Sequence, residues 1–217
     1  MAPSPIRAFA LKALLWLPAS FFLWFWFASP LVWPVVHLAG YVLMATLPGV
    51  FGEAMQHGYL MDVTTHVLVS QIGADGNPAR GELVLTINPM IYGYSLPLFA
   101  GLAMATPTSA WRCTLQLILA LVAIWLAQTF GVVCESFKLL AFDAGTVGAG
   151  AIENAGLSAN AVALAYQFGY LILPAVLPIA LWLGLNRRFI EALVGHSGEP
   201  VVGSQGRSKA ASRLDTR

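Results

Sequence analysis

The chain has 217 residues, of which 58% are hydrophobic and only 10% are charged, and its mean hydropathy is +0.74. A soluble domain carries about 25% charged residues, so this composition excludes a water-soluble globule and indicates a membrane protein. The formal net charge of +1 gives no basis for nucleic-acid binding, which needs a strongly basic surface.

The first apolar stretch is too long to be one membrane helix. Ala13 to Gly52 contains no Asp, Glu, Lys or Arg, and as a single helix it would be roughly 60 Å long, about twice the hydrocarbon core of a bilayer. Pro30 and Pro34 predict the break. We therefore expect a first span at 9–28, as an uncleaved anchor rather than a signal peptide, and a second apolar helix at 31–55.

The next segment, 59–88, has the pattern of a β-hairpin. Apolar and polar side chains alternate over 61–69 and again over 82–87, and a cluster of turn-forming residues from Gly73 to Pro78 separates the two runs. An open hairpin leaves backbone groups unpaired, so it cannot lie in lipid. We expect it in water or at the membrane boundary.

Three further spans are predicted at 90–105, 111–140 and 157–185, and Pro174 and Pro178 predict a kink in the last one. Residues 195–217 are rich in Gly, Ser and charge, which is typical of a disordered tail, and this places the membrane domain at 1–194. The expected fold is an all-α membrane protein. It is a four-helix transmembrane bundle with a boundary helix and a small extracytoplasmic β-hairpin.

The distribution of basic residues predicts the orientation. With four spans, nine of the 11 Lys and Arg residues are cytoplasmic, and Arg80 and Lys138 lie outside. Counting 31–55 as a fifth span would move Arg112 and the basic C-terminal region to the outside. The positive-inside rule favours four spans with both termini in the cytoplasm and 31–55 along the outer boundary.

Cys134 is the candidate nucleophile. With His57 or His66 as base, it would make a membrane-boundary thiol protease, transpeptidase or acyltransferase. Free Cys is also common as a small core residue, and Glu135 and Lys138, one turn apart, predict an ordinary ion pair at a helix end. The histidines lack metal-ligand spacing, so we expect no metal site and no cofactor.

Asn88-Pro89 has the pattern of a helix start, an N-cap residue followed by proline. Polar side chains within the predicted spans are expected to form hydrogen bonds between helices; they are Gln116, Gln128, Gln167, Tyr166 and Tyr170. The residues expected to have structural or interaction roles are Asn88, Pro89, Tyr92, Gly93, Tyr94, Pro97, Glu135, Lys138, Tyr166, Gln167, Tyr170 and Pro174.

Several stretches resemble the exosortase H-associated membrane protein family. The two most specific are Asn88-Pro89-Met90-Ile91-Tyr92-Gly93-Tyr94 and Tyr166-Gln167-Phe168-Gly169-Tyr170. The apolar pieces at 14–18, 28–34, 96–98 and 171–174 also match, as do Gly131-Val132, Lys138, Phe142 and the Asn186-Arg187-Arg188-Phe189 stretch, so the likeness covers most of 9–190.

The resemblance implies a context. Such proteins accompany an exosortase, a Cys-dependent sorting enzyme of the Gram-negative inner membrane that processes proteins with a C-terminal signal, span and basic tail. The expectation is a non-catalytic accessory protein of the inner membrane whose partners are an exosortase, its sorted substrates and the lipid bilayer. The thiol enzyme using Cys134 is the alternative, and a structural anchor that recruits partners through its tail is a third.

Overall fold

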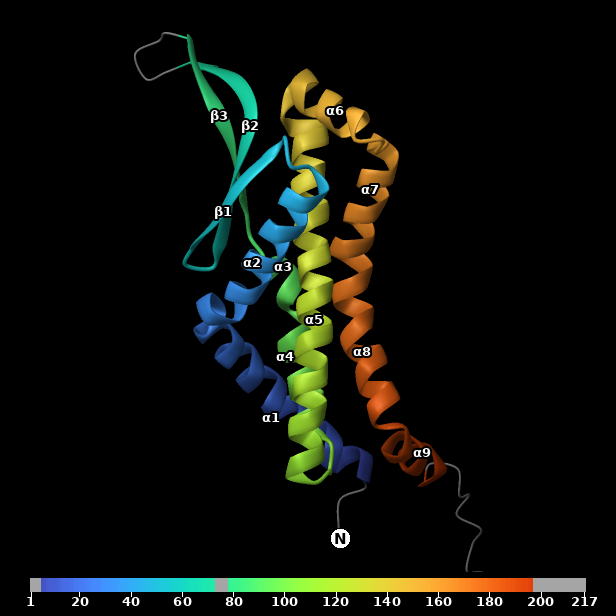
Figure 1. Ribbon diagram of the computed structural model, residues 1–217. Helices are drawn as coiled ribbons and strands as arrows, with labels where there is room; N and C mark the ends of the chain where they lie inside the picture. The colour runs from blue at the N-terminus through green and yellow to red at the C-terminus, as the bar shows by residue number, and fades with distance from the viewer. Residues whose placement is uncertain (1–4, 73–77, 197–217) are drawn as a thin grey trace, which may run out of the picture. The chain divides into compact units, whose positions relative to one another are not determined.

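The computed structural model describes residues 5–72 and 78–196 (Figure 1). It is a largely helical structure with one small antiparallel sheet, which confirms the predicted class of an all-α membrane protein with a small β-hairpin. Residues 1–185 belong to one compact unit, and the last described helix belongs to a second. Most of the predicted tail, 197–217, lies outside the described residues.

The helices follow the apolar stretches of the sequence. They are α1 (Pro5–Trp26), α2 (Ala28–Thr46), α3 (Met90–Gly93), α4 (Ser95–Ala105), α5 (Ala110–Lys138), α6 (Gly145–Asn154), α7 (Ala159–Gln167), α8 (Leu173–Leu185) and α9 (Arg187–His196). Two π-helical turns, η1 (Leu139–Asp143) and η2 (Phe168–Ile172), extend α5 and join α7 to α8. Helix α9 includes the first two residues assigned to the tail, Gly195 and His196.

Four helical segments of the described chain are long and apolar enough to cross a membrane: Ile6–Trp26, Ala28–Thr46, Ala110–Asp143 and Ala159–Leu185. The segment Met90–Ala105 is apolar but shorter. The sequence analysis counted 90–105 among the four spans and placed the second apolar helix at the boundary, so the two sets of four differ in one member.

The first helical break lies earlier than expected. The sequence analysis placed it at Pro30 and Pro34, whereas α1 ends at Trp26 and both prolines lie within α2. A proline ring clashes with the carbonyl four residues before it and supplies no N–H to bond it. For Pro30 this carbonyl belongs to Trp26, so the helix ends there.

The sheet has three strands in the order β1 (Phe51–His57), β2 (Leu60–Ile72) and β3 (Pro78–Ile87). The predicted hairpin is the β2–β3 pair, in which Met61 lies opposite Ile87 and Val63 opposite Leu85. These four side chains are buried, because period two places them on one face. Residues 73–77 of the predicted turn lie outside the described residues.

The predicted helix at 31–55 is wrong at its C-terminal end. Helix α2 ends at Thr46, and Phe51–His57 is the edge strand β1. Pro48 and Gly49 lie in the turn between them and stop the helix. The side chains of β1 after Phe51 alternate between partial and full exposure, as in a strand, and its backbone groups pair with β2.

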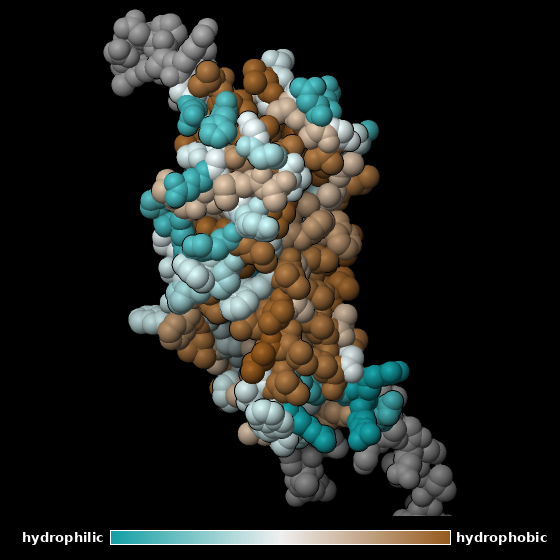
Figure 2. All heavy atoms as spheres, viewed as in Figure 1, coloured by the Kyte–Doolittle hydropathy of each residue, from teal (hydrophilic) through white to brown (hydrophobic). Residues whose placement is uncertain are grey.

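Two clusters of buried apolar side chains divide the unit of residues 1–185. The larger lies among α2, the sheet and the C-terminal half of α5, and includes Val35, Leu43, Met61 and Val132. The smaller lies among α4, the N-terminal half of α5 and α8, around Phe99 and Ile124. Figure 1 shows α5 running beside both groups of elements. The visible surface of the helices is predominantly apolar, whereas polar residues are frequent over the sheet (Figure 2).

Serine hydroxyl groups connect α4 to α1 and to α8. Ser20 Oγ of α1 donates to the carbonyl oxygen of Pro97 at 2.8 Å, and Ser95 Oγ donates to that of Pro174 in α8 at 2.7 Å. Both bonds are buried. Polar groups surrounded by apolar side chains or lipid need such partners, so these bonds fix α4 between α1 and α8.

The contact between α1 and α4 depends on a glycine. A Cβ at Gly101 would lie 2.9 Å from the Cα of Leu17, so α1 would have to move. We expect Gly101→Ala to lower the free energy of unfolding by about 1–3 kcal/mol and to lower the melting temperature in detergent. Gly184→Ala in α8 is the control, because its added Cβ has no atom within 4 Å. Equal melting temperatures for the two variants would contradict this packing.

Candidate functional site

The link from the sheet into the membrane helices places Tyr92 in the interior. Asn88 follows β3, and its Oδ1 accepts a hydrogen bond from the N–H of Met90 at 3.1 Å. Pro89 has helical backbone angles, with φ −61° and ψ −22°. These features start α3 as an N-cap residue and a following proline do. Tyr92 then has only 2% of its surface exposed.

Tyr92 connects three elements. Its hydroxyl donates to Glu135 Oε2 of α5 at 2.9 Å, and its ring covers Gly131, where a Cβ would overlap it. The ring also meets Tyr170 of η2 edge to face at 6.1 Å, and Tyr170 stacks on Tyr166 at 5.6 Å. We call Tyr92, Gly131, Glu135, Tyr166 and Tyr170 the tyrosine cluster.

The π-helical turn η2 brings Tyr170 to this position. Pro174 has no N–H to donate to the carbonyl of Tyr170, so regular α-helical bonding fails one turn before it. A π-helical turn thus directly precedes α8, the helix that contains Pro174 and Pro178, for which the sequence predicts a kink. Beside it, a Cβ at Gly169 would lie 3.2 Å from the Cα of Gly131, so η2 and α5 approach through two glycines.

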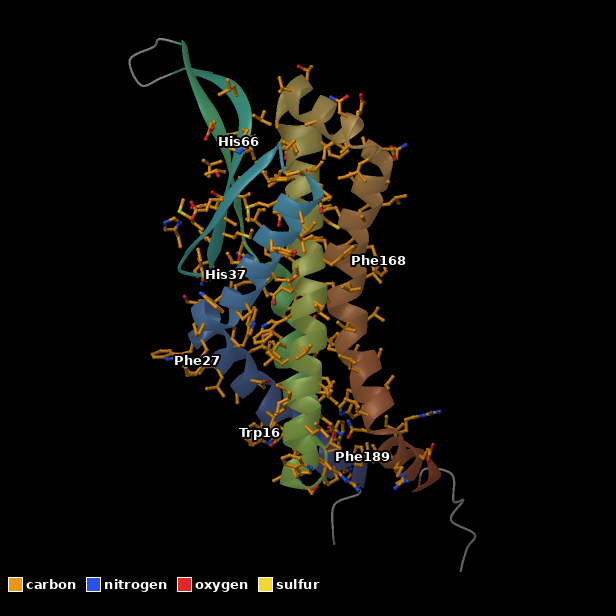
Figure 3. All side chains as sticks on the ribbon, in the orientation of Figure 1. Trp16, Phe27, His37, His66, Phe168 and Phe189 are labelled. Atoms are coloured by element: carbon orange, nitrogen blue, oxygen red, sulfur yellow. The ribbon has the colours of Figure 1, made fainter. Side chains whose placement is uncertain are left out.

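A groove of about 820 Å³ opens next to the tyrosine cluster. One wall is the end of α1 and the start of α2, another is η2, and α3 and the β1–β2 turn complete it. Its lining includes Trp24, Phe25, Trp26, Ser29, Tyr59, Asn88, Tyr94, Tyr170 and Leu171. Tyr170 belongs to both the cluster and the groove, so the cluster holds one wall in place. Phe27 and Phe168, labelled in Figure 3, lie where α1 meets α2 and where η2 begins.

The other predicted interaction residues are dispersed. Gln128 Nε2 donates to the carbonyl oxygen of Pro89 at 2.8 Å and lies against Gly93, whereas the Gln167 side chain is exposed. Lys138 was expected to pair with Glu135, but its ammonium pairs with Asp143 at 2.7 Å. Glu135 lies on the part of α5 that faces Tyr92. Lys138 therefore pairs with the carboxylate of Asp143 on η1 instead.

The candidate thiol and its candidate bases belong to different environments. Cys134 is buried in α5. His57 and His66 are exposed on the sheet, where His57 Nδ1 lies 2.9 Å from Asp62 Oδ2 and His66 Nδ1 lies 3.5 Å from Glu82 Oε1. Figure 3 shows His66 on the sheet. Among the described residues, no group of three His, Cys, Asp or Glu side chains is placed to hold a metal ion.

Sequence reasoning missed part of the groove. Trp24, Phe25 and Ser29 come from the α1–α2 corner, and Tyr59 comes from the β1–β2 turn. The density of aromatic residues at 24–27 was a signal, because Trp and Tyr gather at membrane interfaces, but the sequence did not show which segments face one another.

The fold and this site define a membrane protein with several apolar helices and a small sheet, whose site is a groove beside the tyrosine cluster. The chain belongs to the exosortase H-associated membrane protein family, whose model matches residues 3–189. Comparisons with curated proteins and with solved structures give no match.

Removing the Tyr92 hydroxyl tests the cluster. Tyr92→Phe leaves the Glu135 carboxylate without this donor in a half-buried position, and a hydrogen bond to a charged group contributes about 1.5–3 kcal/mol. We expect a lower melting temperature in detergent, whereas Tyr41→Phe on the exposed surface of α2 is expected to leave it unchanged. In a double-mutant cycle, Tyr92→Phe with Glu135→Gln should show coupling. Strictly additive effects would contradict a direct interaction.

Proposed function

We propose that this protein is a non-catalytic accessory subunit of an exosortase-type C-terminal protein-sorting system in the inner membrane of a Gram-negative bacterium. Its partners are the exosortase or the membrane anchors of sorted proteins. The family match over residues 3–189 supports the association with an exosortase. The geometry supports the manner of association, which is contact between membrane helices.

The exposure of α1 is the observation that carries this proposal. Only 6% of its candidate span is buried within the chain. Phe22, Phe25 and Trp26 are among its exposed side chains, and α1 packs mainly on α4. Association of membrane helices depends on side-chain packing and interhelical hydrogen bonds rather than on escape from water. A helix covered so little by its own chain offers a broad face to a partner helix.

We further propose four crossings by α1, α3–α4, α5 and α7–α8, with both termini in the cytoplasm. The packing of α4 on α1, α5 and α8, and of α5 on α8, supports this set. In addition, the segment Ala110–Asp143 has 34 residues and is about 50 Å long, which exceeds the roughly 30 Å of the hydrocarbon core. Its C-terminal part therefore extends beyond the lipid, beside α2 and the sheet.

The position of α2 argues against its use as a returning span. A return would place α2 antiparallel to α1, but α2 packs on β1 and on α5, where Trp125 Nε1 donates to the carbonyl oxygen of Leu31 at 3.1 Å. Figure 1 shows α1 and α2 continuing toward the same end of this unit. The sheet follows at that end, so α3–α4 provides the return.

Reporter fusions test this orientation. Alkaline phosphatase fused after Arg80 is expected to be active, because this position lies outside the cytoplasm, and a fusion after Pro107 is expected to be inactive. Green fluorescent protein at the same two positions should give the reverse result, which also controls for expression. Fluorescence after Arg80 without phosphatase activity would overturn the proposed topology.

A sorting assay tests the non-catalytic role. Deletion of the gene is expected to impair processing of sorted proteins, and the tagged chain should retain the exosortase or a sorted protein after extraction in mild detergent. Cys134→Ala should restore processing as well as the wild-type chain does, because the proposed role uses no thiol. Cys113→Ala is the matched control.

Two results would contradict the proposal. Normal processing after deletion would remove the accessory role. Failure of Cys134→Ala to restore processing, at a normal protein level and with normal restoration by Cys113→Ala, would favour the alternative of a thiol-dependent enzyme.

A further inference from the structure

The groove has a lining without formal charge. Six of its lining side chains are aromatic, and Asp, Glu, Lys, Arg and His are absent from its described lining residues. The polar contributions come chiefly from Ser29, Asn88 and the tyrosines. An occupant of this part therefore gains from apolar and aromatic contact and presents no charge to it.

A second, more polar hollow of about 630 Å³ lies beside the groove. The two share Ser29 and Gly58, and the second is also lined by Trp33, His37 and Gln56. Gln56 Nε2 donates to the carbonyl oxygens of Ser29 at 2.9 Å and Gly58 at 2.6 Å, which holds the shared wall together. From the groove to the second hollow, the lining thus changes from mostly apolar to more polar.

We propose that these two hollows form one docking groove for the end of a partner's transmembrane helix, at the point where that chain leaves the bilayer. This inference rests on the proposed function and names the surface that it uses. The occupant is apolar and uncharged where it lies among Trp24, Phe25 and Tyr94, and polar where it reaches Gln56. A helix that ends at the membrane boundary has this sequence of properties.

The lack of Lys and Arg among the described lining residues favours a helix end over a phospholipid. A phospholipid also changes from apolar to polar, but its headgroup carries a phosphate that is best recognised by Lys or Arg. Neither residue type is among the described residues that line the polar hollow, and the Nδ1–H of His37 donates to the carbonyl oxygen of Trp33 at 2.8 Å. A lipid in the groove is therefore the competing outcome of the test.

Two matched pairs of positions allow a site-specific test with a photo-crosslinking amino acid. Phe25 lines the groove and Phe22 does not, yet both are on α1 and are 71% and 65% exposed. Leu171 lines the groove and Leu164 does not, and they are 61% and 67% exposed. Each variant of the full chain is expressed with the exosortase and one sorted protein of the same organism. Adducts are then mapped by mass spectrometry.

We expect positions 25 and 171 to crosslink to the end of one transmembrane helix of a co-expressed protein, and positions 22 and 164 to give much less of that adduct. Ser29→Trp should reduce the adduct at both groove positions roughly tenfold, because filling the junction of the two hollows costs binding free energy. It keeps the backbone carbonyl that accepts from Gln56. Leu164→Trp is the control for bulk on the helical surface.

The outcomes separate this inference from the proposed function. If the partner co-purifies but crosslinks equally at groove and control positions, the groove is not the docking surface although the association stands. Lipid adducts alone, or adducts to a second copy of this chain, would also overturn the inference. If no co-expressed protein co-purifies and none crosslinks, both proposals fail.

Discussion

The position of the Tyr92 ring determines how α3, α5 and η2 pack together. Tyr92 lies in α3, which follows β3 and leads into the membrane helices. Its ring packs on Gly131, and its hydroxyl donates a hydrogen bond to Glu135. A polar group in an apolar interior is costly unless it has a partner. This single side chain therefore fixes the position of α3 along α5. Through its contact with Tyr170 it also fixes the position of η2.

The parts of the fold that could be predicted are those that depend on neighbouring residues in the sequence. Long apolar stretches and period-two alternation around a turn are local properties, and they predicted the apolar helices and the β2–β3 hairpin. Strand β1 was missed because Phe51–His57 continues an apolar stretch, and its alternation became meaningful only beside β2. The helix breaks at Trp26 because Pro30 clashes with the carbonyl four residues before it. This effect is also local, but the sequence analysis placed the break at the proline itself.

The site was predictable only in part for a similar reason. The sequence singled out Tyr92, Glu135, Tyr166 and Tyr170 individually, and the structure brings them together. No local pattern relates a tyrosine in α3 to a carboxylate 43 positions later. Ser20 and Ser95 were overlooked because one hydroxyl in an apolar helix is an unremarkable feature until a carbonyl oxygen of another helix accepts from it.

The location of the groove follows from the difference in length between α5 and the helices beside it. Helix α5 is long enough to extend past the hydrocarbon core, whereas α1 ends at Trp26 and α4 begins at Ser95. The chain must turn at both of these ends near one level of α5, and turns fill space less completely than continuous helices do. The aromatic residues at the α1–α2 corner, α3 and η2 surround the resulting space. A partner helix that ends at the level of the sheet, as proposed above, would match a groove in this position.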